Sequence, residues 1–156
     1  MKILELFCGT KSFAKVAKER GHEVFTVDID KRFEPDLCIN ILELTPQMIL
    51  DKFGLPDVIW ASPPCTTFSV ASIKHYWDNG KPKNDKTLLG IQIVKKTIEL
   101  IRILSPSFWV IENPRGMLRK QDSCIKSCFL SIPLGFSITQ KLGLNILISS
   151  IVFLTI

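Results

Sequence analysis

The chain has 156 residues, of which 46% are hydrophobic and 22% are charged, and its formal net charge is +5 with a pI near 9.0. These values exclude a chain that is too short or too polar to bury a core, and they are typical of one globular domain. The basic balance favours an anionic partner, with nucleic acid as the first candidate.

The five cysteines are an odd number, which favours reduced thiols and a cytoplasmic location over a disulfide framework. Met1 and Lys2 lead directly into a short apolar run, without the pattern of a signal peptide. Cys124 and Cys128 have no paired Cys or His at zinc-site spacing, so the sequence predicts no metal site.

The first elements in chain order form a strand–helix–strand unit. Residues 3–7 predict a strand, and residues 8–12 predict a turn in which Thr10 or Ser12 caps a helix that stops at Gly21. Residues 24–27 predict a second strand, which Asp28 follows directly. Such a unit places a nucleotide-like ligand at its first turn and a carboxylate against the ribose. The turn contains one glycine, so a purely structural turn remains an alternative for Gly9.

The next elements lead to a cysteine on a stiff turn. Residues 37–41 predict a third strand, and Thr45 with Pro46 predicts the start of a helix. Residues 58–61 predict a fourth strand, after which two prolines cannot continue the sheet and Cys65 follows at once. A thiol at the carboxyl end of a strand is placed as a nucleophile would be, although most unpaired cysteines are buried core residues.

Residues 66–86 combine cations and aromatic side chains with turn residues. A long loop of this composition suits a lid or a binding loop that contacts phosphates and stacks on bases, and a solvated surface loop is the alternative. Residues 88–104 then predict a packed helix, and residues 108–111 predict a fifth strand that Glu112 follows.

The alternation of strands and helices predicts an α/β fold with a doubly wound, mostly parallel sheet. Right-handed crossovers place the carboxyl ends of all parallel strands at one edge. The glycine turn, Asp28, Cys65 and Glu112 are therefore expected to meet at that edge.

Three stretches in this order resemble motifs I, IV and VI of the DNA cytosine-5 methyltransferases: Leu4-Glu5-Leu6-Phe7-Cys8-Gly9, Pro63-Pro64-Cys65 with Phe68-Ser69, and Glu112-Asn113. The resemblance implies a Rossmann-like, S-adenosylmethionine-dependent fold and methyl transfer to carbon 5 of cytosine in DNA. It implies that Cys65 is the nucleophile and that Glu112 is the acid.

The resemblance also implies contacts to the cofactor and to DNA that carries a flipped-out cytosine. The implied cofactor contacts are Phe7, Gly9, Thr10, Ser12, Asp28, Ile29, Asn40, Ile41 and Pro63. The implied DNA contacts are Ser69, Lys74, Lys81, Lys83 and Arg115.

The resemblance predicts a catalytic domain over residues 1–120, followed by an apolar tail over residues 121–156. Nothing in the tail resembles motifs VIII to X or a target-recognition region, so we expect a truncated or frame-shifted product that lacks DNA specificity. Residues 142–156 are almost wholly apolar but shorter than the roughly 20 residues that span a bilayer, so no membrane association is predicted.

Three alternatives remain at the level of sequence. Ser62-Pro63-Pro64 also resembles methyltransferases that act on the exocyclic amine of cytosine or adenine, although Cys65 and Glu112 would then have no task. A non-catalytic remnant that binds nucleic acid or cofactor is the second alternative. A purely structural role for Cys65 is the third.

Overall fold

The computed structural model describes residues 1–112 of the chain. The predicted DNA contact Arg115 and the predicted boundary between residues 1–120 and the tail lie outside the described residues.

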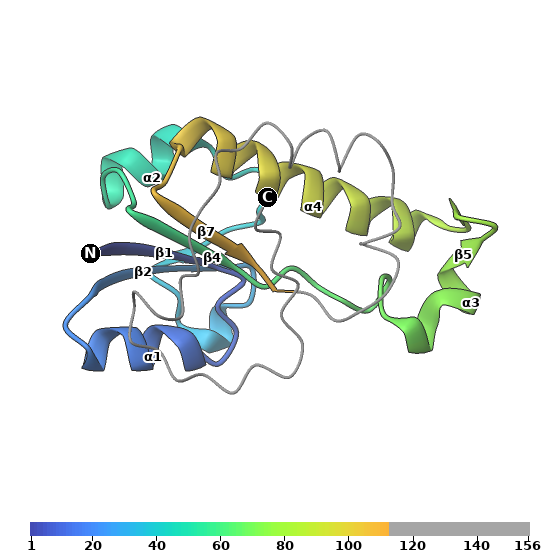
Figure 1. Cartoon of the computed structure of the whole chain (residues 1–156), viewed down its shortest axis with the longest axis horizontal. Coiled ribbons are helices and arrows are strands. Elements are labelled where there is room, and N and C mark those ends of the chain that lie inside the picture. Colours follow the sequence, from blue (N-terminus) through green and yellow to red (C-terminus); the bar gives the residue numbers. More distant parts are fainter. Residues whose placement is uncertain (113–156) are drawn as a thin grey trace.

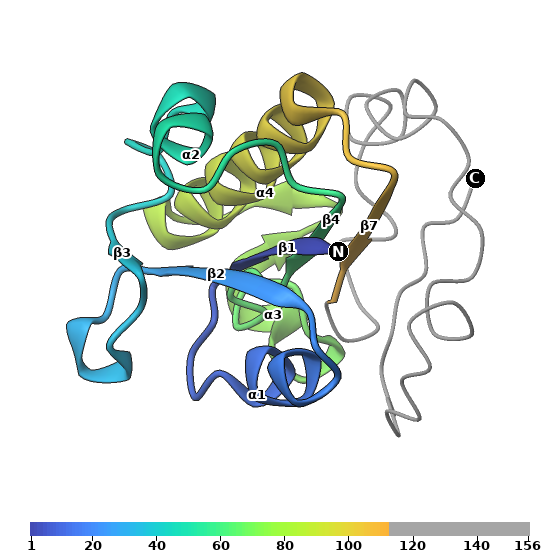
Figure 2. The same cartoon turned by 90° about the vertical axis from the view of Figure 1, so that its left-hand side faces the viewer.

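The centre of the molecule is a parallel sheet with the strand order β3-β2-β1-β4-β7 (Figure 1 and Figure 2). Its strands are β1 (Lys2–Leu6), β2 (Glu23–Asp28), β3 (Leu37–Cys38), β4 (Val58–Ala61) and β7 (Phe108–Ile111). The chain starts in the middle, builds one side through β2 and β3, and then returns to build the other side through β4 and β7. The predicted doubly wound α/β fold is therefore confirmed, and the strand order reverses between β1 and β4.

Helices cover both faces of the sheet (Figure 1 and Figure 2). Helix α1 (Ser12–Glu19) packs on one face, where Phe13 stacks on Trp60 with ring centroids 4.3 Å apart. Helices α2 (Pro46–Lys52) and α4 (Asp85–Leu104) pack on the other face. Successive residues of β1 and β4 alternate between the two cores, as a strand buried on both faces requires.

Local capping explains where two of these helices begin. Thr45 precedes α2 and its hydroxyl accepts a hydrogen bond from the Met48 N–H at 3.2 Å, with Pro46 at the first helical position as predicted. Asn84 caps α4 by accepting from the Thr87 N–H at 3.0 Å, so this helix begins at Asp85, earlier than predicted.

Three predicted details at the carboxyl edge are wrong. The backbone of Phe7 has a φ of 61°, so β1 ends at Leu6, and β3 ends at Cys38 instead of reaching residue 41. The helix α1 begins after Lys11 without a side-chain cap, because the hydroxyls of Thr10 and Ser12 lie 2.9 Å apart and bond each other.

The sequence predicted a long irregular loop over residues 66–86. The structure shows instead that these residues form a small folded insertion. It contains the 3-10 helix η2 (Val70–Ser72), helix α3 (Ile73–Tyr76) and a hairpin of β5 (Trp77–Asp78) and β6 (Lys81–Pro82). The insertion projects beyond the carboxyl ends of the strands (Figure 1). Among the helices in residues 1–112, none is long and apolar enough to cross a membrane.

Candidate active site

Backbone hydrogen bonds beyond the strand ends hold the carboxyl edge together. In each of the four pairs of neighbouring strands, a residue just beyond one strand donates its backbone N–H to a carbonyl at the carboxyl end of the adjacent strand. These hydrogen bonds run from Glu112 to Ala61 (2.8 Å), from Ser62 to Leu6 (3.2 Å), from Cys8 to Val27 (3.2 Å) and from Ile39 to Asp28 (2.9 Å). The segments that carry the predicted site residues therefore follow one another along a single edge, next to the point where the strand order reverses.

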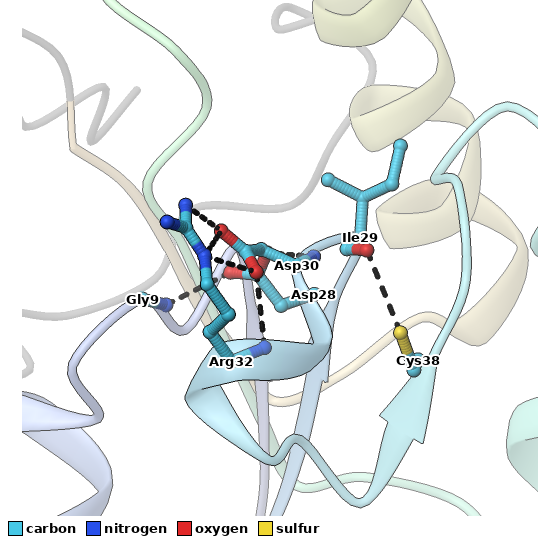
Figure 3. A network of polar contacts seen from close by, with 6 residues as sticks. All are labelled: Gly9, Asp28, Ile29, Asp30, Arg32 and Cys38. Atoms are coloured by element: carbon cyan, nitrogen blue, oxygen red, sulfur yellow. Dashed lines mark hydrogen bonds and ion pairs between the residues drawn. The ribbon is translucent and has the colours of Figure 1, made fainter.

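The turn after β1 is tied to the end of β2 by a carboxylate. Asp28 accepts a hydrogen bond from the Gly9 N–H at 2.9 Å with one oxygen and from the Asp30 N–H at 2.9 Å with the other (Figure 3). Gly9 has a φ of 48°, and a Cβ built on it would meet no atom of residues 1–112 within 4 Å. The left-handed backbone is thus the reason for this glycine, and the described residues leave the space beside the turn open.

The residues that follow Asp28 form an exposed polar network with one apolar side chain. The guanidinium of Arg32 donates hydrogen bonds to both carboxylate oxygens of Asp30, and the Arg32 backbone N–H donates to one of them. The side-chain hydrogen bonds have the larger effect and the backbone hydrogen bond the smaller, and together they lower the pKa of Asp30 to about 2. Ile29 is 67% exposed, and its side chain points away from this ion pair (Figure 3). We refer to residues 7–11 and 28–32 together as the polar edge.

Glu5 is a candidate cofactor contact that is not among the contacts predicted from the sequence. It lies in β1, is only 4% exposed, and has one carboxylate oxygen without a hydrogen-bond partner among residues 1–112. Burial raises its pKa to about 7, and the nearby charge of Asp28 adds to this effect, while a hydrogen bond from the Ala14 backbone opposes it. The available signal in the sequence was a single charged residue inside an otherwise apolar strand.

The other predicted cofactor residues lie at this edge with different exposures. Thr10 and Ser12 are exposed at the start of α1. Asn40 lies beyond β3 and its side chain accepts from the Leu42 N–H at 3.1 Å, while Ile41 packs into the core. Pro63 is buried just after β4. Their contact with a cofactor stays a prediction.

Cys65 lies in a tight turn that we call the thiol segment, residues 63–69. The thiol is exposed, and the Cys65 carbonyl accepts hydrogen bonds from the N–H groups of Phe68 at 2.9 Å and Ser69 at 3.0 Å. Cys8, by contrast, is buried. Its burial is the main cause that raises the pKa of its thiol to about 11, and the negative charges of Asp28 and Glu5 add to this effect. Cys8 therefore stays protonated near neutral pH, which makes it a poor nucleophile.

Apolar packing anchors the thiol segment to the folded insertion. Phe68 is fully buried, and its ring lies 6.1 Å from the ring of Trp77. The indole N–H of Trp77 donates to the Thr67 carbonyl at 2.6 Å. Trp77 is 3% exposed, so in this structure its ring packs in the core and is not available to stack on a base.

Glu112 lies directly after β7, beside the end of β4. Its side chain is half-buried, and this burial raises the pKa of its carboxyl group. A carboxyl group with a raised pKa holds its proton at a higher pH, which suits a proton or hydrogen-bond donor.

The predicted DNA contacts of the insertion are mostly exposed cations. Lys74 and Lys81 are exposed, and the Lys83 ammonium donates to the Lys74 carbonyl at 2.9 Å. The ammonium of Lys86 lies 5.6 Å from the ring centroid of Tyr76. Ser69 is half-buried at the end of the thiol segment. In the part of the chain that the structure describes, no group of three or more His, Cys, Asp or Glu could hold a metal ion.

Comparison with known proteins gives three findings. A family model for C-5 cytosine-specific DNA methylases matches residues 1–139. The "Probable DNA (cytosine-5)-methyltransferase" of Frog virus 3 (isolate Goorha) is 33% identical over 121 residues, which cover 73% of this chain and 54% of the relative. The chain thus spans about half the length of the curated relative that it matches.

The third finding is a crystal structure of the S. pombe Dnmt2 methyltransferase, which is similar to this chain with a TM-score of 0.53 and 15% sequence identity. The match covers 82% of this chain and 38% of that chain. This likeness supports the methyltransferase-type fold.

Proposed function

The chain belongs to the C-5 cytosine-specific DNA methylase family, and from that premise we propose that it binds S-adenosylmethionine and methylates carbon 5 of cytosine in DNA through Cys65. The observation that carries this proposal is the arrangement at the carboxyl edge. The Gly9 turn bonded to Asp28, the exposed thiol of Cys65 and the carboxyl of Glu112 follow neighbouring strands.

The polar edge fits S-adenosylmethionine. Residues 1–112 leave the space beside Gly9 open, and the Asp28 oxygens have further lone pairs for the ribose hydroxyls. Ile29 offers an exposed apolar surface to the adenine ring. One Glu5 oxygen has no hydrogen-bond partner within residues 1–112, so it can accept a hydrogen bond from a cationic group. When bound, S-adenosylmethionine supplies an electrophilic methyl group.

Cys65 and Glu112 carry the chemistry on the base. The Cys65 thiolate adds to carbon 6 of cytosine, and the electrons of the 5,6 double bond move toward carbon 5 and ring nitrogen 3. The Glu112 carboxyl stabilises that charge by donating a proton or a hydrogen bond at nitrogen 3. After methylation, carbon 5 loses its proton and the thiolate leaves, which restores the double bond.

The exposed cations of the insertion provide the contacts to DNA. Lys74 and Lys81 lie beyond the carboxyl edge, on the insertion that also contains Lys83. Their charges suit phosphate groups of the strand from which the cytosine is flipped, and this contribution should weaken as salt is added. Ser69 adds a hydroxyl next to the thiol segment.

A trapping experiment tests the proposal. The full chain is incubated with S-adenosylmethionine and a duplex that contains 5-fluorocytosine. Its fluorine takes the place of the hydrogen on carbon 5, so the proton loss that would release the cysteine cannot occur and the adduct is trapped. We expect a covalent complex that is lost in Cys65→Ser and kept in Cys38→Ser, which changes another exposed thiol.

Other outcomes would contradict the proposal in distinct ways. Methylation of an exocyclic amine by the Cys65→Ser variant would assign the chain to the amino-methyltransferase type. Absence of S-adenosylmethionine binding in calorimetry would indicate a non-catalytic remnant.

A further inference from the structure

Helix α4 approaches the thiol segment closely at Gly90. This glycine is buried in the second turn of α4, and a Cβ built on it would lie 2.6 Å from the Thr67 hydroxyl oxygen. The same Cβ would lie 3.3 Å from Cε2 of Phe68. A Cβ and an oxygen atom do not approach to the first of these distances, so with any other residue at position 90 the Thr67 hydroxyl or the helix would have to shift.

Backbone conformation does not account for a glycine at this position. Gly90 is absent from the residues of positive φ in the described chain and lies inside a regular helix of 20 residues. A glycine in a helix interior is destabilising relative to alanine. The contact with the thiol segment is therefore the feature that requires it.

The thiol segment has little freedom to retreat from α4. The Trp77 indole holds the Thr67 carbonyl, and the buried ring of Phe68 fills the core beneath it. The Thr67 hydroxyl is buried and has no hydrogen-bond partner among residues 1–112, so it fills space against the helix. The Phe68 N–H bonds the Cys65 carbonyl, so a shift of Phe68 would reach Cys65 through the turn.

We propose that Gly90 is a positioning residue that sets the place of the Cys65 thiol by letting Thr67 and Phe68 pack directly on α4. The importance of this position for catalysis rests on the proposed function of Cys65. The packing itself does not, so the two can be tested separately.

The test compares Gly90→Ala with Gln92→Ala, an exposed substitution on the same helix. In Gly90→Ala we expect kcat to fall by about 10²-fold while KM for S-adenosylmethionine stays unchanged, because a misplaced reacting group costs rate and not cofactor binding. Alkylation of Cys65 by iodoacetamide, followed by peptide mass spectrometry, should become faster relative to Cys38 as the turn loosens. Wild-type values in Gly90→Ala for both readouts would overturn the proposal.

The alkylation ratio separates this proposal from the proposed function. If the wild-type chain methylates no cytosine, the proposed function fails, and the reactivity of Cys65 relative to Cys38 still decides the role of Gly90.

A double-mutant cycle covers the case in which Gly90→Ala does not fold. Adding Thr67→Ala removes the atom that the new methyl group meets, so the loss caused by Gly90→Ala should be smaller in that background. Equal losses in both backgrounds, or a double variant that also fails to fold, would overturn the proposal.

Discussion

The polar edge and the thiol segment lie side by side on the sheet, but different forces hold them. Hydrogen bonds to carboxylates shape the polar edge, where Phe7, Gly9 and Lys11 all have positive φ. Buried rings and one close helix contact shape the thiol segment. The region proposed to bind the cofactor is therefore organised by charge, and the segment proposed to present the nucleophile is organised by volume. The first should respond to pH and the second to side-chain size.

The largest effect is expected from removing the ring that anchors the thiol segment. Phe68→Ala should reduce the free energy of unfolding by about 3–5 kcal/mol, because a fully buried aromatic side chain is replaced by a cavity. Urea denaturation measures this difference. Val70→Ala, at a residue that is 65% exposed, is the matched control and should change stability little. Similar losses in the two variants would contradict the packing account.

The next effect tests the response to pH beside the polar edge, where Glu5 of β1 is buried close to the charge of Asp28. The folded-state pKa of Glu5 is about 7 and its ordinary value is 4.5, so the folded chain binds this proton more tightly. The stability that comes from protonated Glu5 is fully present below pH 4.5 and is lost as the pH rises through about 7. Glu5→Gln should therefore be more stable than wild type by about 3 kcal/mol near pH 8 and equal to it near pH 4.

Denaturation of Glu5→Gln at the two pH values measures this crossover. Glu19→Gln removes an exposed carboxylate at the end of α1 and serves as the control for net charge. A stability difference that is the same at both pH values would show that the buried carboxyl does not titrate as expected. No such pH dependence is expected for the loss caused by Phe68→Ala.

The smallest effect tests the hydrogen bonds of the polar edge. Asp28→Asn leaves one carbonyl oxygen for two backbone donors, so either the Gly9 or the Asp30 N–H loses its acceptor. We expect a loss of about 1.5–3 kcal/mol in the free energy of unfolding and weaker binding of S-adenosylmethionine in calorimetry. Arg32→Ala, which removes only the exposed partner of Asp30, is the control. Equal cofactor affinity in wild type and Asp28→Asn would contradict the role of this carboxylate.

Much of the fold could be predicted because its signals are local. The alternation of apolar runs and helical patterns predicted the five strands and three main helices, and Thr45-Pro46 predicted a helix start that the structure confirms. The errors occur where a local preference competes with a neighbour. Thr10 and Ser12 are good capping residues, but their hydroxyls bond each other, and Lys11 takes the capping position.

The insertion shows the limit of composition most clearly. Residues 66–86 contain the cations, aromatics and turn residues of an exposed loop, and Lys74 and Lys81 are indeed exposed. Trp77, in the same stretch, is buried because its indole N–H finds the Thr67 carbonyl and its ring meets Phe68. The local sequence pattern does not distinguish a tryptophan that packs in the core from an exposed tryptophan that can stack on a nucleic-acid base.

The sequence by itself determined the order of strands and helices, the stiff Pro63-Pro64 turn that presents Cys65, and the family to which these motifs belong. Those features depend on neighbours in the chain, through periodicity, capping and the fixed φ of proline. Only the tertiary structure decided that Glu5 is buried with one oxygen that has no partner in the described part of the chain, that Trp77 is an anchor, and that Gly90 allows the thiol segment to reach α4. Each of these depends on atoms that are far apart in the chain and meet only when the sheet and its helices pack.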